Sequence, residues 1–184
     1  ITDIVAQGLV MRNVTRPIFI ILNNRLNRIG SSVGLLDMPA IGTMERITLS
    51  DILATDDEEM FNTHYRLGKD VMGQPSFNGI RVDACESDPI RDLTLRNITY
   101  TFVGGVKKED IPADYPKVWD MRHEHPDKVS ENYYPNWSRT TFMDVRNVER
   151  LTLDGLRFHA MTEDTRASYM IENCKTFKED IVEY

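Results

Sequence analysis

The sequence predicts an all-β fold, part of a right-handed parallel β-helix. Two observations predict it: a nine-residue phrase recurs along the chain, and short apolar segments that suit strands lie between its copies. Within each phrase apolar and polar residues alternate, which is the period of a half-buried strand. Strands that recur with loops of variable length between them are typical of a solenoid, in which each coil stacks on the previous one.

The phrase reads apolar, any two residues, apolar, any, apolar, any, Asn or Asp, apolar. Its copies span residues 44–52, 90–98 and 148–156, and in the last copy the Asp comes one place early. A weaker copy near the start of the chain is assigned to Leu9, Met11, Asn13 and Val14. Because Asn and Asp tolerate the left-handed backbone conformation, each phrase predicts a strand followed by a bend.

A second set of strands is expected between the phrases, at residues 18–22, 79–84, 140–145 and 167–172. An antiparallel β-sandwich is the alternative, because it also contains many short strands. The only Asn-Gly pair, Asn78-Gly79, would signal a tight hairpin. It follows a long segment instead of joining two strands, which favours the parallel fold.

Composition and charge argue against several classes of binding partner. The 184 residues include 22 Lys and Arg and 29 Asp and Glu, for a net charge of −7. A net-acidic domain lacks the basic surface of a general nucleic-acid binder, or of a protein that binds anionic membranes by charge. The chain contains no run of about 18 apolar residues, so no membrane-spanning helix is expected.

Neither the cysteines nor the histidines predict a metal site. Cys85 and Cys174 lie in apolar neighbourhoods and are predicted to be buried free thiols. His123 and His125 have no third ligand at a recognisable spacing and are expected to be exposed. We therefore expect no metal and no cofactor.

Three stretches carry a family resemblance. They are NVTRPIFIILNNR at 13–25, PIRDLTLRNI at 89–98 followed by Gly104 and Gly105, and the segment 133–154, from Tyr133-Tyr134-Pro135 to Asp154. In this order they resemble glycoside hydrolase family 28, the polygalacturonase and rhamnogalacturonan hydrolase family. The resemblance implies a pectin-lyase-like solenoid and the hydrolysis of α-glycosidic bonds of pectin with inversion. Inversion needs one carboxylic acid and one carboxylate base with room for water between them.

The catalytic motifs of that family are absent from this chain. There is no Asn-Thr-Asp, no Gly-His-Gly and no Arg-Ile-Lys, and the pair Asp56-Asp57 stands in an acidic run that is typical of a solvated loop. In the family these motifs precede the stretch at 13–25. The resemblance thus implies that residues 1–184 are the C-terminal coils of one β-helix domain, with an inserted loop at about 106–139. It implies no catalytic residue here, no activity of this part alone, a monomer, and secretion or a periplasmic location.

Several residues remain candidates for binding a polysaccharide. Arg25 ends a predicted strand that lies beside the substrate in the family, and a guanidinium suits the carboxylate of galacturonate. Asn23 and Asn24 suit sugar hydroxyls, or are turn residues. Arg81 and Asp83 point to the same side of a strand, as part of a distal subsite or as a surface ion pair. The insertion supplies aromatic candidates, which otherwise anchor the loop: Tyr133, Tyr134 and Trp137.

Two other functions are open. One is a non-catalytic, carbohydrate-binding β-helix. The other is a β-helix pectate lyase, which needs a Ca²⁺-binding carboxylate cluster and an Arg base and yields unsaturated products.

Overall fold

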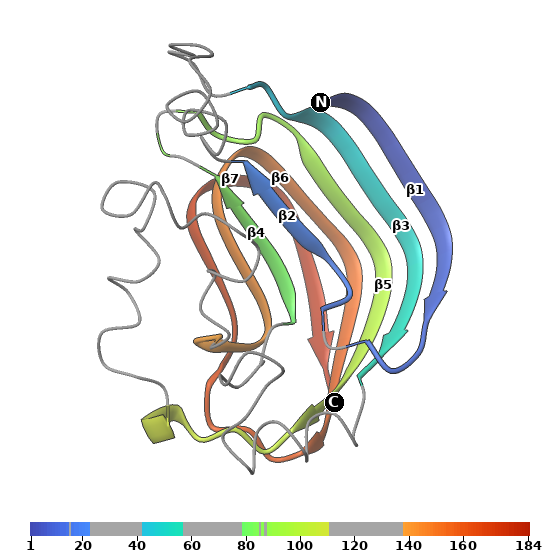
Figure 1. Cartoon of the computed structure of the whole chain (residues 1–184), viewed down its shortest axis with the longest axis vertical. Helices are drawn as coiled ribbons and strands as arrows, with labels where there is room; N and C mark the ends of the chain where they lie inside the picture. The colour runs from blue at the N-terminus through green and yellow to red at the C-terminus, as the bar shows by residue number, and fades with distance from the viewer. Residues whose placement is uncertain (15, 23–41, 57–78, 85, 87, 111–137) are drawn as a thin grey trace, which may run out of the picture.

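The protein is all-β, and its strands form one parallel sheet (Figure 1). The computed structural model describes residues 1–14, 16–22, 42–56, 79–84, 86, 88–110 and 138–184. The strands are β1 (Thr2–Met11), β2 (Phe19–Leu22), β3 (Glu45–Thr55), β4 (Ile80–Ala84), β5 (Leu93–Gly104), β6 (Thr140–Thr162) and β7 (Ala167–Glu183). A short 3-10 turn, η2 (Lys108–Asp110), follows β5. Every pairing between these strands is parallel, so the antiparallel sandwich is wrong.

The sheet has two arms that meet in the long strand β6. The first part of β6 pairs with β4, and β4 pairs with β2. The second part of β6 pairs with β5, and beyond β5 lie β3 and β1. β7 follows β6 along both parts. The sheet is curled, so that the two arms face each other across the core (Figure 1).

The three phrases lie side by side in register, as a repeat requires. Ile47 pairs with Leu93 and Leu93 pairs with Leu151, which gives one apolar column across β3, β5 and β6. A second column follows five residues later at the end of the phrase, through Ile52, Ile98 and Leu156. All six side chains are buried. The alternation within the phrase therefore sets which face of this arm packs into the core.

The bend predicted within each phrase is confirmed by the backbone. Asp51 and Asn97 have φ angles of 56° and 48°, in the left-handed region. In the third copy the left-handed residue is Gly155, with φ 67°, and not Asp154 before it. The amide of Asn97 donates to Asp51 Oδ1 at 2.7 Å, which links the bends of neighbouring strands.

The weak copy of the phrase was placed wrongly in the sequence. In the structure Ile4 pairs with Ile47 and Leu9 pairs with Ile52, so the copy occupies residues 1–9. At the bend of this copy the left-handed residue is Gly8, with φ 71°, where two of the other copies have Asp51 and Asn97 and the third has Gly155. Asn13 also has a positive φ, of 59°, but it forms a separate bend after β1.

The strands expected between the phrases are present, with different ends. β2 and β4 confirm the predictions at 18–22 and 79–84 to within one residue. The segments 140–145 and 148–156 form one strand, because Asn147, with φ 58°, turns the chain without a loop. Its amide donates to Ala84 O at 2.6 Å. Asn173 repeats this turn in β7, with φ 51°, and its amide donates to Asn147 Oδ1 at 2.6 Å.

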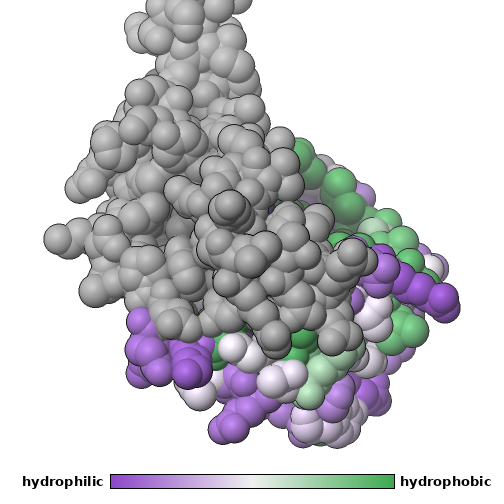
Figure 2. All heavy atoms as spheres, turned by 60° about the horizontal axis from the view of Figure 1, so that its bottom comes forward, coloured by the Kyte–Doolittle hydropathy of each residue, from purple (hydrophilic) through white to green (hydrophobic). Residues whose placement is uncertain are grey.

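One border of the sheet is exposed and apolar. Most of β1 is exposed, including Ile4, Val5, Leu9 and Val10. Figure 2 shows apolar residues gathered along the side of the molecule where β1 runs. No helix in the described part of the chain is long and apolar enough to cross a membrane.

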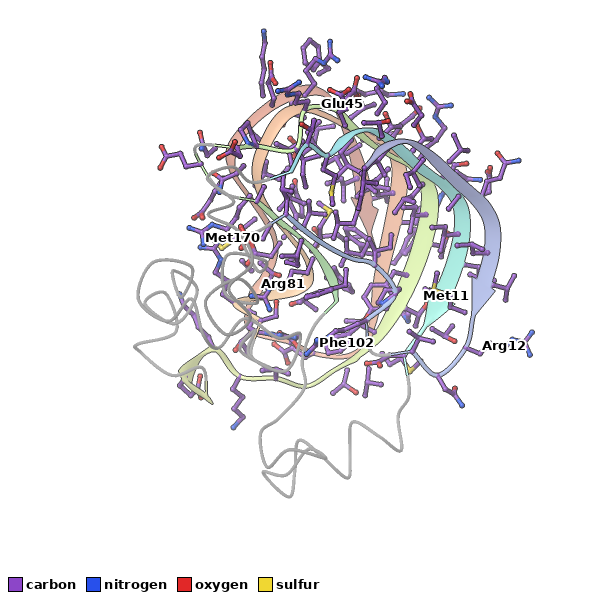
Figure 3. All side chains as sticks on the ribbon, turned by 45° about the horizontal axis from the view of Figure 1, so that its top comes forward. Met11, Arg12, Glu45, Arg81, Phe102 and Met170 are labelled. Atoms are coloured by element: carbon purple, nitrogen blue, oxygen red, sulfur yellow. The ribbon has the colours of Figure 1, made fainter. Side chains whose placement is uncertain are left out.

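Aromatic side chains fill the core where the arms approach one another. Phe142 and Phe158 stack with their ring centroids 5.0 Å apart, and Tyr100 meets Phe142 edge to face at 6.3 Å. Phe102, at the end of β5, is buried and labelled in Figure 3. Burying one such side chain stabilises the fold by about 1.5–3 kcal/mol.

Candidate functional site

Charged side chains gather on the outer face of the arm that contains β2, β4, β6 and β7. Val82 and Val145 pair with each other and belong to the core. Because side chains alternate along a strand, the neighbouring column of Arg81, Asp144 and Met170 faces the other way. Figure 3 labels Arg81 and Met170 on this arm.

We name this set the charged row. Its members come from three neighbouring strands and the residue just before β6: Arg81, Asp83, Arg139, Asp144, Arg146 and Glu172. Arg81 and Asp144 are register partners. Asp83 and Arg146 each lie two residues further along their strand, and therefore on the same face.

Arg139 joins two strands of the charged row by paired hydrogen bonds. It donates to Asp144 of β6 from Nε at 2.8 Å and from Nη2 at 2.9 Å. It also donates to Glu172 of β7 from Nη1 at 2.9 Å and from Nη2 at 2.8 Å. Arg146 Nε lies 3.1 Å from Glu172 Oε2. Bidentate pairs of this kind fix the planes of the guanidinium and the carboxylates.

The charged row has a buried end and a half-exposed end. Asp83, Asp144 and Arg81 are almost fully buried. The side chains of Arg146 and Glu172 are 29% and 37% exposed. Buried charges persist only when partners compensate their lost hydration, and Arg139 supplies such a partner for the buried carboxylate of Asp144.

The carboxylate of Glu172, at the half-exposed end, is held in the ionised form. Hydrogen bonds from Arg139 lower the pKa of Glu172 below its usual value. Burial acts to lower the pKa of Arg139, but its hydrogen bonds to Asp144 and Glu172 outweigh burial and raise it. A general acid in glycoside hydrolysis needs a raised pKa. Glu172 is therefore suited to hold arginines in place and not to donate a proton.

Asp56 differs from its prediction as part of a solvated run. It is buried, and its backbone N–H donates to Thr101 O at 2.9 Å, which continues the pairing at the end of β3. Its charge acts on Tyr100, whose pKa is raised first by burial and then by Asp56. Asp57 lies outside the described residues.

The candidates from the sequence are only partly placed. Arg81 and Asp83 share one face, as predicted, but the alternative of a surface pair is wrong because both are buried. Cys174 is a free thiol, half-buried, and burial raises its pKa. The other candidates lie outside the described residues: Asn23, Asn24, Arg25, Cys85, His123, His125, Tyr133, Tyr134 and Trp137.

The sequence analysis missed most of the charged row. Asp144 and Arg146 lie in a segment that was predicted to be a strand, and their spacing of two matches that of Arg81 and Asp83. This shared spacing could have indicated that both pairs lie on one face of the sheet. No sequence pattern indicated Arg139, because the position of its side chain depends on the path of the chain just before β6.

A second buried charge cluster has a structural character. Arg166 donates to both carboxylate oxygens of Asp164 at 2.8 Å, and to Ser138 O at 2.9 Å. Asp164 also accepts from Thr141 Oγ1 at 3.0 Å and from Val106 N at 3.2 Å. These bonds tie the β6–β7 turn to Val106, which follows β5, and to Ser138, which precedes β6. In the part of the chain that is described, no group of three His, Cys, Asp or Glu side chains is placed to hold a metal.

No protein-family model, no curated protein and no solved structure matches this chain.

Proposed function

We propose that this chain is the C-terminal part of a secreted, pectin-directed glycoside hydrolase, and that its charged row binds sugar carboxylates. In this proposal the intact enzyme hydrolyses α-glycosidic bonds of galacturonan or rhamnogalacturonan with inversion, and its catalytic Asp residues precede Ile1. One observation carries the binding role: Arg139 and Arg146 stand at the half-exposed end of the charged row, on one face of the sheet.

The arrangement of the strands supports a β-helix. In one arm β2, β4, β6 and β7 are neighbours in chain order, and in the other β1, β3, β5, β6 and β7 follow the same rule. The chain visits the two arms alternately. This order is what successive coils of a solenoid produce, and it agrees with the resemblance to family 28 in the stretches at 13–25, 89–98 and 133–154.

A non-catalytic carbohydrate-binding β-helix is the second candidate. It accounts equally well for the bidentate pairs in which Arg139 holds Asp144 and Glu172, because the first candidate also places its catalytic residues outside this chain. Carboxylates held in this way can orient arginines but do not form the acid and base pair of a hydrolase. The two candidates share the charged row as a binding site and differ only in what the rest of the protein does.

Oligogalacturonate binding tests the proposed role of the charged row. We expect the chain to bind oligogalacturonates in a salt-dependent manner, and the same oligosaccharides after carboxyl reduction to bind far more weakly, in titration calorimetry. Arg146→Gln should weaken binding about tenfold, the scale of one charge-assisted hydrogen bond. Arg150→Gln is the matched control, because Arg150 also pairs with a carboxylate, Asp92, but lies outside the charged row.

Three outcomes would contradict the proposal, and a fourth would favour another class of enzyme. Equal affinity for the native and the carboxyl-reduced oligosaccharide would show that carboxylates are not recognised. Equal effects of Arg146→Gln and Arg150→Gln would show that binding does not involve the charged row. Release of reducing sugar by the 184-residue chain alone would contradict the placement of the catalytic groups outside it, and unsaturated products that absorb in the ultraviolet would favour the pectate lyase.

A further inference from the structure

We propose that Glu172 competes with the ligand for the charged row: its carboxylate occupies the place that a sugar carboxylate takes when an oligogalacturonate binds. This inference rests on the proposed function, because it concerns the same site. It adds a residue that limits the affinity of that site. Removing the charge of Glu172 should therefore strengthen binding, whereas removing the charge of Arg146 should weaken it.

Glu172 lies in a complete receptor for a carboxylate. Its Oε1 accepts a hydrogen bond from Arg139 Nη1 at 2.9 Å, and its Oε2 accepts one from Arg139 Nη2 at 2.8 Å. Its register partner on β6, Arg146, places Nε 3.1 Å from the same Oε2. The carboxylate of a uronic acid has the same planar pair of oxygens, which a guanidinium binds in bidentate fashion. The two arginines around Glu172 therefore suit a sugar carboxylate, and Glu172 fills the position that this carboxylate needs.

Both edges of the Arg139 guanidinium are engaged. Nε and Nη2 donate to the two oxygens of Asp144, at 2.8 and 2.9 Å. Nη1 and Nη2 donate to the two oxygens of Glu172. Because a guanidinium forms bidentate pairs through these edges, a ligand carboxylate can pair with Arg139 in this way only after one of the two carboxylates has left.

Burial decides which carboxylate the ligand displaces. The side chain of Asp144 is 1% exposed, and without Arg139 its buried charge would lose a partner that compensates its lost hydration. The side chain of Glu172 is 37% exposed, so it can rotate into water, which hydrates the carboxylate once the ion pair is broken. The pair of Arg139 and Asp144 is thus the fixed part of the site, and Glu172 is the part that a ligand replaces.

This exchange makes the site selective for oligosaccharides over a single sugar acid. A monosaccharide that displaces Glu172 replaces one ion pair by another, so most of the electrostatic gain cancels. Binding also costs translational and rotational freedom, and a single sugar acid has little left to offset that cost. An oligosaccharide loses this freedom once, and its neighbouring units add further contacts.

Titration calorimetry with trigalacturonate tests the competition. We expect Glu172→Gln to bind about tenfold more tightly than the unaltered chain, the scale of one charge-assisted hydrogen bond. The reason is that the charged row holds as many arginines as carboxylates, and this change leaves one arginine in excess. Glu45→Gln is the matched control: Glu45 also accepts from two arginines, Arg46 and Arg91, but lies outside the charged row. Monomeric galacturonate should bind the unaltered chain far more weakly than trigalacturonate does.

A second measurement needs no substitution. The hydrogen bond from Arg139 lowers the pKa of Glu172, and the charged groups that face this carboxylate are Arg139 and Arg146. Saturation of the isotopically labelled chain with unlabelled trigalacturonate should raise this pKa towards its usual value, because the ligand takes over these hydrogen bonds. Carboxyl NMR titration follows Glu172 with and without the ligand.

Four outcomes would overturn the inference while the proposed function stands. They are equal or weaker binding of trigalacturonate by Glu172→Gln, equal gains from Glu172→Gln and Glu45→Gln, an unchanged pKa of Glu172 on saturation, and equal affinity of the unaltered chain for the monosaccharide and the trisaccharide. Equal gains would indicate a general effect of net charge. A lack of trigalacturonate binding by both the unaltered chain and Glu172→Gln would instead overturn the proposed function, and this inference with it. The two failures are therefore distinguishable.

Discussion

At the scale of single residues, the setting of a charge matters more than the distance to its partner. Arg166 and Arg150 each place Nη2 2.8 Å from an aspartate oxygen. The side chains of Arg166 and Asp164 are 0% and 2% exposed, whereas Arg150 is 54% exposed. Losing one member of a buried pair leaves an uncompensated charge, whereas an exposed pair is largely replaced by water.

Arg166→Met should therefore destabilise the protein by about 3–5 kcal/mol, and Arg150→Met by less than about 1 kcal/mol. Urea unfolding of both variants measures the difference. The two substitutions are matched, because each removes one guanidinium whose Nη2 lies 2.8 Å from an aspartate oxygen. Similar losses of unfolding free energy would contradict the structural role of the Asp164–Arg166 pair.

The pair between Asp3 and Arg46 predicts a shifted titration. The hydrogen bond from Arg46 lowers the pKa of Asp3 from 3.8 to about 2. Because the folded pKa is the lower one, this pair favours folding above about pH 4, and that contribution is lost as the pH falls towards 2. NMR titration of the Asp3 carboxyl should give a midpoint near 2, which Arg46→Gln returns to about 4. An unchanged midpoint in Arg46→Gln would show that the pair does not form in solution.

At the scale of the elements, the nine-residue phrase was predictable because its geometry is local. Alternation and an Asn or Asp identified β3, β5 and part of β6, and the left-handed φ of Asp51 and Asn97 confirms the bend. The copy in β1 was misplaced because Gly8 supplies the same φ without the Asn or Asp signal. The extension of β7 to Glu183 was also missed, because its second half alternates weakly and takes its strand conformation from pairing with β6.

The candidate site was less predictable, because it depends on contacts between strands. The shared face of Arg81 and Asp83 follows from a spacing of two. The burial of both, and the joining of Asp144 to Glu172 by Arg139, depend on which strands become neighbours. The periodicity of one strand does not indicate which other strand will lie beside it.

Substitutions at two glycines separate the energetic cost of a left-handed backbone conformation from the cost of a steric clash. Gly8 and Gly104 have φ angles of 71° and 75°. A Cβ at Gly8 meets nothing within 4 Å, whereas at Gly104 it lies 2.0 Å from Thr162 O. Gly8→Ala should cost about 1–2 kcal/mol from the left-handed conformation alone, and Gly104→Ala should cost clearly more. Gly8→Asn should be better tolerated than Gly8→Ala, because Asn favours this conformation. Thermal unfolding ranks the three variants, and equal shifts for Gly8→Ala and Gly104→Ala would refute the steric argument.

At the scale of the whole molecule, stability is distributed unevenly across the sheet. The inward side chains of β5 and β6, such as Leu95 and Leu153, are fully buried between neighbours on both sides. Among the described strands β1 pairs with β3 alone, and its inward residues Ile4 and Leu9 are exposed. In a sheet built of stacked strands each strand depends on its immediate neighbours, so we expect the molecule to open from β1 towards β5 and β6.

Native-state hydrogen exchange should reveal this gradient. Amides of β1 should exchange through local opening, those of β3 more slowly, and those of β5 and β6 only on global unfolding. Leu95→Ala should lower the unfolding free energy by about 2–5 kcal/mol and accelerate exchange in every strand. Ile4→Ala should cost much less and accelerate exchange mainly in β1, because Ile4 is already 41% exposed. Uniform protection of β1, β3 and β5 from exchange would contradict the gradient. It would mean that the described sheet unfolds as one unit, and that the exposed edge of β1 does not lower the local stability of this strand.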